Sequence, residues 1–142
     1  MMTDIENQLN KDGKLLWMTT GVSMQPMLTE RTEQIVIEKL NGRPKLFDVV
    51  LYKRKSGAYV LHRIVRKNSA GYVIQGDNCA YVEQVPIERI LGVLVGFYRD
   101  DKYIDCRKNI KYRIYSVLWI PGQTLLRFMR RVYSKIKRTL FK

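Results

Sequence analysis

The sequence predicts a mainly β domain over residues 1–106, followed by a basic amphipathic helical extension over residues 107–142. Two observations indicate the β domain: short apolar segments recur at fairly even intervals, and Gly, Asn, Asp or Pro lies between them, as in strands joined by tight turns. A third observation indicates the extension, because apolar residues late in the chain recur at helical spacing. With 142 residues, 46% of them hydrophobic, the chain is long enough to bury a core.

The expected elements follow in chain order. Residues 2–12 form a short polar helix or a loose arm, and residues 15–20 form a strand that leads into a turn at Ser23. Ser56-Gly57 is the tip of an expected hairpin, and Gly92 and Gly96 mark bends or bulges in a long strand. The remaining strands are expected over 34–40, 48–53, 59–66, 72–75, 90–98 and 102–106.

The extension carries most of the positive charge. The net charge is +13, and residues 107–142 hold eleven Lys or Arg and no Asp or Glu. We expect residues 123–140 to form a helix that starts after a break at Pro121-Gly122. Three uses of this helix stay open: lying on an anionic membrane surface, packing on the β domain with its charges in water, or contacting nucleic-acid phosphates, which is the least favoured.

No metal or cofactor site is expected. The two cysteines, Cys79 and Cys106, and the single histidine do not make a metal-ligand spacing, and free thiols in a reducing compartment are favoured over a disulfide. Residues 1–14 lack the apolar core of a signal peptide, and residues 114–129 are too short and too polar to cross a bilayer. These features predict a cytoplasmic protein that contacts a membrane only peripherally, through its basic segment 109–142.

Ser23 and His62 are the first candidate site residues. Ser23 lies in a turn bracketed by Gly21 and Pro26, and His62 is the single histidine, in the expected strand 59–66. A serine hydroxyl becomes a useful nucleophile at neutral pH when a nearby base takes its proton. Alternation along the strand puts His62 on an apolar face, where burial would keep its imidazole neutral near pH 7. Taken alone, each residue is more typical of an ordinary role, as a turn serine or a packed core histidine.

Two carboxylates are candidates for orienting the imidazole. Asp77 lies in the Gly76-Asp77-Asn78 turn, and Glu83 follows a few residues later. Either could accept a hydrogen bond from one ring nitrogen and leave the other nitrogen facing Ser23. The sequence does not choose between them, and Asp77 alone is equally typical of a surface Asx-turn.

Five short motifs occur in order between residues 15 and 98. They are Gly-x-Ser-Met-x-Pro-Met-Leu at 21–28, Phe-Asp-Val-Val-Leu-Tyr at 47–52, His-Arg-Ile-Val at 62–65, Gly-Asp-Asn at 76–78 and Ile-Leu-Gly at 90–92. Together they resemble the type I signal peptidase superfamily, which includes the self-cleaving repressor peptidases. The usual bacterial members pair the serine with a lysine. His62, which stands in place of that lysine directly before Arg63, resembles the archaeal and endoplasmic-reticulum signal peptidases.

The resemblance implies a coiled β-sheet domain and a serine endopeptidase that cleaves a peptide or precursor protein through an acyl-enzyme. It implies that Ser23 is the nucleophile and His62 the general base, with Asp77 and Glu83 at the two acidic positions of the family. The membrane-spanning anchor of true signal peptidases is not seen in this sequence. A non-catalytic binding module with the same fold, docking through its basic tail, is the alternative. A self-cleaving regulator is less favoured, because few residues precede the core.

The sequence departs from the family pattern beside the nucleophile. Gly21 stands where bacterial members often have a Ser or Thr hydroxyl, so the oxyanion hole would depend on backbone N–H groups such as that of Ser23. Met24 and Pro26 are the expected substrate-binding residues. Two further departures are Phe47 in place of Gly and Glu83 in place of Asp.

Overall fold

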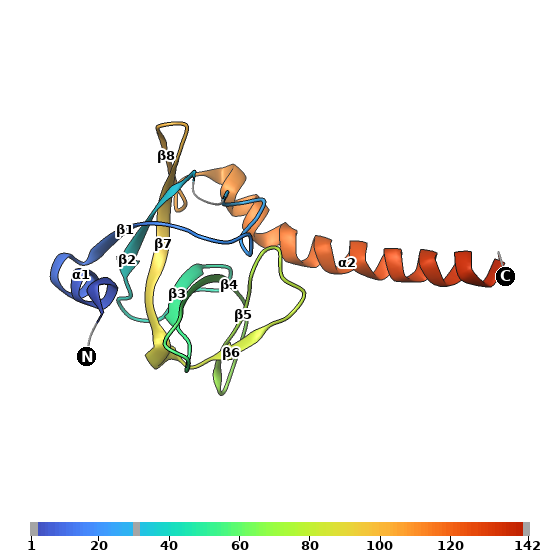
Figure 1. The fold of residues 1–142 in the computed structure, drawn as a ribbon, viewed down its shortest axis with the longest axis horizontal. Helices are drawn as coiled ribbons and strands as arrows, with labels where there is room; N and C mark the ends of the chain where they lie inside the picture. The colour runs from blue at the N-terminus through green and yellow to red at the C-terminus, as the bar shows by residue number, and fades with distance from the viewer. Residues whose placement is uncertain (1–2, 30–31, 141–142) are drawn as a thin grey trace.

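The computed structural model describes residues 3–29 and 32–140. Within them it contains an antiparallel sheet of eight strands and a long C-terminal helix (Figure 1), so the expectation of a mainly β chain that ends in a helix is confirmed. The helices are α1 (Asp4–Asp12), the short 3-10 helix η1 (Ile87–Arg89) and α2 (Ile110–Leu140). The strands are β1 (Lys14–Met18), β2 (Gln34–Lys39), β3 (Val49–Lys53), β4 (Tyr59–Asn68), β5 (Gly71–Gln75), β6 (Glu83–Val85), β7 (Ile90–Arg99) and β8 (Lys102–Asp105).

The expected elements of the β domain are confirmed, with ends displaced by one or two residues. One strand was not predicted. The segment β6 is only three residues long and pairs with β5 at the edge of the sheet. It is important for the site because it carries Glu83.

Strand β7 organises the sheet. The strand order is β1-β2-β7-β3-β4-β5-β6, and β8 also pairs with β7. The pairing register shifts at both of its glycines, as expected for bulges: Gly96 lies opposite Val36 and Gly92 lies opposite Leu51. A Cβ atom at Gly92 would approach the Glu38 carbonyl oxygen to 2.7 Å, so β2 and β7 meet more closely there than a side chain would allow.

Two buried apolar clusters form the core. The first contains Met24, Met27 and Leu28 from the turn around Ser23, together with Leu61 of β4. The second lies under β3 to β6 and contains Tyr52. The three apolar side chains of the turn are at most 6% exposed, so they anchor the turn against the core.

The C-terminal helix differs from its prediction. It was expected to begin at residue 123 after a break at Pro121-Gly122, but α2 begins at Ile110 and continues through Pro121. Proline inside a helix removes one backbone hydrogen bond. Contacts on both sides offset this loss, because Trp119 and Gln123 each donate a hydrogen bond to the main-chain oxygen of Asp77.

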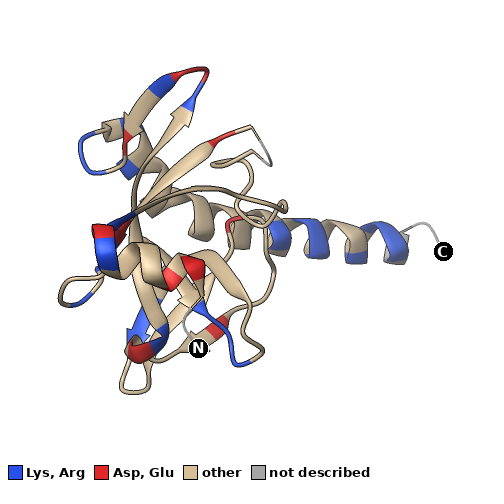
Figure 2. Cartoon of the chain, turned by 60° about the vertical axis from the view of Figure 1, so that its left-hand side comes forward, with Lys and Arg blue, Asp and Glu red and all other residues tan. Residues whose placement is uncertain are grey.

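The two halves of α2 have different surroundings. Tyr112 and Tyr115 pack against the first core cluster. The C-terminal part of α2 extends away from the sheet (Figure 1), and residues 128–138 are all exposed. Lys and Arg recur along this projecting part (Figure 2). Among the helices that the structure describes, none is both long and apolar enough to cross a membrane.

Candidate active site

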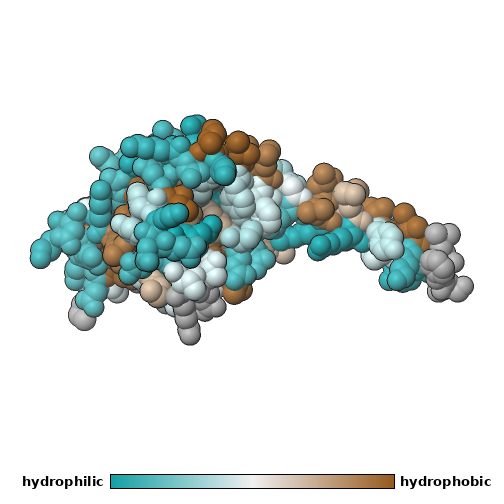
Figure 3. All heavy atoms as spheres, turned by 90° about the horizontal axis from the view of Figure 1, so that it is seen from above, coloured by the Kyte–Doolittle hydropathy of each residue, from teal (hydrophilic) through white to brown (hydrophobic). Residues whose placement is uncertain are grey.

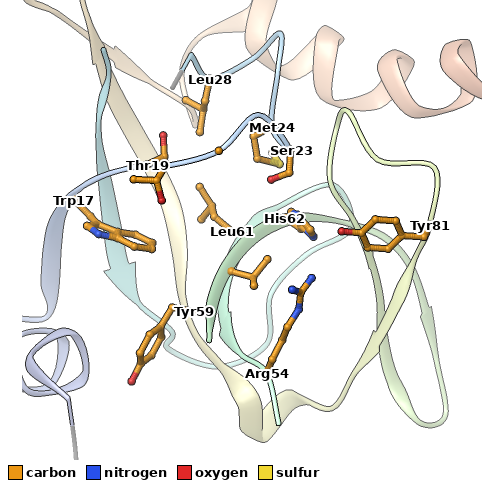
Figure 4. A pocket seen from close by; sticks show the side chains of 13 residues that line it. Trp17, Thr19, Ser23, Met24, Leu28, Arg54, Tyr59, Leu61, His62 and Tyr81 are labelled. Atoms are coloured by element: carbon orange, nitrogen blue, oxygen red, sulfur yellow. The ribbon is translucent and has the colours of Figure 1, made fainter. Parts of the chain in front are cut away.

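A pocket of about 280 Å³ opens beside the Ser23 turn. Figure 4 shows Ser23 and His62 in the same pocket, with Ser23 on a loop and His62 on the strand beneath it. The sequence predicts that these two residues meet, and in the structure both line this pocket. The pocket is lined by Trp17, Thr19, Thr20, Gly21, Ser23, Met24, Leu28, Arg54, Tyr59, Val60, Leu61, His62 and Tyr81.

The Ser23 turn is held by its own backbone and by its buried methionines. Gly21 has a φ of +94°, a backbone conformation that residues other than glycine rarely adopt. Met24, one of the two expected substrate-binding residues, lines the pocket and is 5% exposed. Pro26 is exposed and does not line the pocket.

The Gly76-Asp77-Asn78 turn clamps the serine turn from the side. The backbone N–H of Asn78 donates to the Ser23 carbonyl oxygen at 2.8 Å, and the Asn78 side chain donates to the Val22 carbonyl oxygen at 3.2 Å. A Cβ atom on Gly76 would lie 2.8 Å from the Ser23 carbonyl oxygen and 2.9 Å from His62 Nε2. These two atoms therefore flank one glycine, and Gly76 leaves the space that lets the serine turn approach the imidazole.

His62 is a buried, neutral base. Its ring is 2% exposed, and burial lowers its pKa to about 4, with Glu83 opposing the shift. The imidazole is therefore unprotonated at pH 7, as a general base must be. The sequence expected this burial on an apolar face, and it is confirmed.

Tyr52 selects the tautomer of His62. The Tyr52 hydroxyl donates to Glu83 Oε1 at 2.9 Å and lies 3.3 Å from His62 Nδ1. A hydroxyl has a single proton, so with that proton on Glu83 it can only accept from Nδ1–H. The ring proton therefore lies on Nδ1, and Nε2 keeps its lone pair on the side of Gly76 and Ser23.

Glu83 ends this relay as a carboxylate. The pKa of Glu83 is lowered, mainly by hydrogen bonds from Arg54. Arg54 Nε lies 2.8 Å from Glu83 Oε2. Glu83 Oε1 is 3.8 Å from His62 Nδ1. The negative charge is thus within reach of an imidazolium that forms on His62, although the hydrogen-bonded path runs through Tyr52.

Asp77 has a different task. It is completely buried and accepts two hydrogen bonds of 2.8 Å from Arg63, which is equally buried. The Tyr115 hydroxyl donates to the same carboxylate at 3.0 Å. The structure therefore directs this carboxylate to Arg63 and Tyr115, whereas the carboxylate in the His62 relay is that of Glu83.

Helix α2 holds the other side of the clamp. Trp119 Nε1 donates to the Asp77 carbonyl oxygen at 2.9 Å and Gln123 Nε2 donates to the same oxygen at 2.6 Å. Arg127 donates to the Cys79 carbonyl oxygen at 3.2 Å. The loop that positions Ser23 is therefore fixed between the sheet and α2. Cys79 is a buried free thiol, and so is Cys106.

Sequence reasoning missed Tyr52, Arg63 and the α2 residues. A signal for Tyr52 was present, since a hairpin with its tip at Ser56-Gly57 brings strands 48–53 and 59–66 together. In the structure Val50 pairs with His62 and Tyr52 pairs with Val60, so Tyr52 and His62 are diagonal neighbours on one face. For Arg63, the alternation of side chains along the strand predicts only that it lies on the face opposite His62. It does not predict the pairing of Arg63 with Asp77.

The site combines a hydroxyl, a neutral base and a carboxylate behind that base, which are the kinds of group that acyl transfer by a serine uses. Comparison with known proteins gives no relative from which this chemistry could be transferred. No model of a known protein family matches the chain, and no curated protein matches it. The functional conclusion therefore depends on the geometry of Ser23, His62, Tyr52 and Glu83.

Proposed function

We propose that the protein is a serine endopeptidase, similar to signal peptidases, that acts on a peptide or precursor protein. The observation that carries the proposal is the arrangement around His62. Its Nδ1 is occupied by the Tyr52–Glu83 relay, and its Nε2 lies beside the Ser23 turn in an open pocket. A histidine that served only to fill the core would not need an ionised relay behind one ring nitrogen and a place in the lining of a pocket that Ser23 also lines.

The proposed reaction begins when Ser23 Oγ attacks the carbonyl carbon of the scissile peptide bond. His62 Nε2 takes the hydroxyl proton, and the resulting imidazolium is stabilised by Tyr52 and by the Glu83 carboxylate. The oxyanion forms near the backbone N–H of Ser23, since Gly21 offers no hydroxyl. Collapse of this intermediate breaks the C–N bond, and the leaving amine receives the proton from Nε2. Water then attacks the acyl-serine with the same base, which frees Ser23.

The pocket indicates what part of a substrate it would take. Its volume of about 280 Å³ is at the small end for ligand sites, so it suits one or two side chains of a peptide. Trp17, Leu28 and Leu61 supply an apolar part. Arg54 lies in the same pocket, but its guanidinium is paired with Glu83, so among the described residues that line the pocket no Lys or Arg is left unpaired for the substrate. A small or medium apolar side chain next to the cleaved bond therefore fits best.

The test compares the wild type with Ser23→Ala and His62→Ala. Each protein is incubated with a peptide library rich in small residues, and cleavage is read by mass spectrometry. A fluorophosphonate probe supplies a second reading, since it forms an adduct only with an activated serine. We expect cleavage and an adduct on Ser23 in the wild type, and loss of both in the two variants. Cleavage by Ser23→Ala at the wild-type rate would exclude the proposed nucleophile. Failure of the wild type in both assays would favour the non-catalytic binding module.

A further inference from the structure

The projecting part of α2 carries apolar and basic side chains that have no use in the proposed peptidase chemistry. Between residues 124 and 138 there are six Lys or Arg and no Asp or Glu. Apolar side chains in this segment are well exposed to solvent: Leu125 59%, Leu126 56%, Phe128 63%, Met129 56%, Val132 41%, Tyr133 69% and Ile136 51%. A contiguous run of exposed apolar side chains commonly marks a site that contacts another protein or a membrane.

The two kinds of side chain lie on different sides of the helix. At about 100° per residue, the seven apolar side chains fall within an arc of roughly 160°, and the basic ones fall on the remaining side. Figure 3 shows hydrophobic atoms gathered along one side of the projecting helix and hydrophilic atoms along the other. The surface therefore matches a partner that is apolar in its interior and negatively charged at its border.

We propose that residues 125–138 dock on the surface of an anionic lipid bilayer, with the apolar arc in the acyl region and the Lys and Arg side chains among the headgroups. Charge complementarity decides against a second copy of the helix. A helical dimer would bring together two segments that carry only positive charge, without the acidic residues that pair with Lys and Arg in coiled coils. Nucleic acid would satisfy the basic side but leave the apolar arc in water.

The helix that would bind the bilayer is the same helix that contacts the loop around Asp77 and Cys79 beside the proposed active site. Arg127 lies at the point where α2 leaves the domain and donates to the Cys79 carbonyl oxygen, one helical turn after Gln123 contacts Asp77. A bilayer that binds residues 125–138 thus keeps the domain, and the pocket beside Ser23, close to the membrane surface. The docking itself does not depend on the reactivity of Ser23, so it stands or falls separately from the proposed function.

The experiment is flotation of the full chain with two kinds of vesicle, phosphatidylcholine alone and phosphatidylcholine with about one third phosphatidylglycerol. One variant changes the apolar arc (Met129→Gln, Val132→Gln and Ile136→Gln), and another reverses charge (Arg130→Glu and Arg131→Glu). Gln and Glu are good helix formers, and all five positions are exposed, so the fold is expected to persist and is checked by circular dichroism. The matched control, Lys11→Glu with Lys102→Glu, makes the same change in net charge at exposed positions outside α2.

We expect the wild type and the control to float with the anionic vesicles and to stay behind with the neutral ones. Each basic residue near such a surface strengthens binding by roughly fivefold, so the charge-reversed variant should bind at least tenfold more weakly. The apolar variant should lose binding to a similar extent. The proposal is overturned if the wild type does not float with anionic vesicles, if the apolar variant floats as well as the wild type, or if duplex DNA of equal total charge displaces the wild type from the vesicles.

Discussion

Removing one oxygen atom from Tyr52 tests the relay behind His62. In Tyr52→Phe the ring stays in the core, where Tyr52 is 1% exposed, but the hydroxyl that joins His62 Nδ1 to Glu83 is lost. A hydrogen bond to a charged group contributes about 1.5–3 kcal/mol, and a buried donor left unpaired costs a similar amount. We therefore expect unfolding to require about 1.5–3 kcal/mol less free energy.

The same loss should appear in the reaction. Without Tyr52 the ring proton is no longer held on Nδ1, and the imidazolium loses its connection to the carboxylate. A loss of about 1.4–2.7 kcal/mol in transition-state stabilisation is a fall of about 10–100-fold in the rate of fluorophosphonate labelling or peptide cleavage. Tyr72→Phe is the matched control, since Tyr72 is 5% exposed and lies in the same core cluster. If Tyr52→Phe reacts within twofold of the wild type while His62→Ala is inactive, the relay does not orient His62.

Three further predictions concern the clamp and the buried charges. Gly76→Ala forces a Cβ atom to within 3 Å of the Ser23 carbonyl oxygen and His62 Nε2. It should abolish serine labelling at a cost of about 1–3 kcal/mol in stability, whereas Gly122→Ala, with open space around it, should leave labelling unchanged. The pKa of His62 is about 4 in the folded protein, compared with 6.5 for an ordinary histidine. Between these values the unfolded chain binds the proton and the folded chain does not, so stability should fall by about 1.4 kcal/mol per pH unit as the pH drops from 6.5 to 4. The acid limb of the activity profile should also lie near pH 4. Denaturant titrations at several pH values give the free energy of unfolding, and the change of this free energy with pH should differ between the wild type and His62→Asn only between about pH 4 and 6.5. Asp77→Ala leaves the Arg63 guanidinium buried without its partner and should destabilise the fold by about 3–5 kcal/mol, as read from the midpoint of urea unfolding. Adding Arg63→Met should restore part of that loss, and a double variant no more stable than Asp77→Ala would contradict this explanation.

Much of the fold follows from local patterns. Strand positions could be predicted because each segment is bounded by residues with strong turn preferences, such as Ser56-Gly57. The bulges of β7 could be predicted for the same reason, since glycine inside a strand is unfavourable unless the backbone needs it. Helix α2 shows where local reasoning fails. Pro121 predicts a break, yet contacts from Trp119 and Gln123 to the Asp77 loop hold the helix across it.

The candidate site divides in the same way. Local pattern was enough to single out a serine in a turn bracketed by glycine and proline and a single histidine in a strand, because residue types and their neighbours are local properties. Long-range contacts, by contrast, place Glu83 behind His62 through Tyr52 and pair Asp77 with Arg63. Asp77 and Glu83 both lie in the short stretch from the end of β5 to the start of β6, so their positions along the chain cannot show which of them faces His62. The path of the loop, the pairing of β6 with β5 and the packing of α2 set where each carboxylate lies, and these depend on contacts between residues far apart in the sequence.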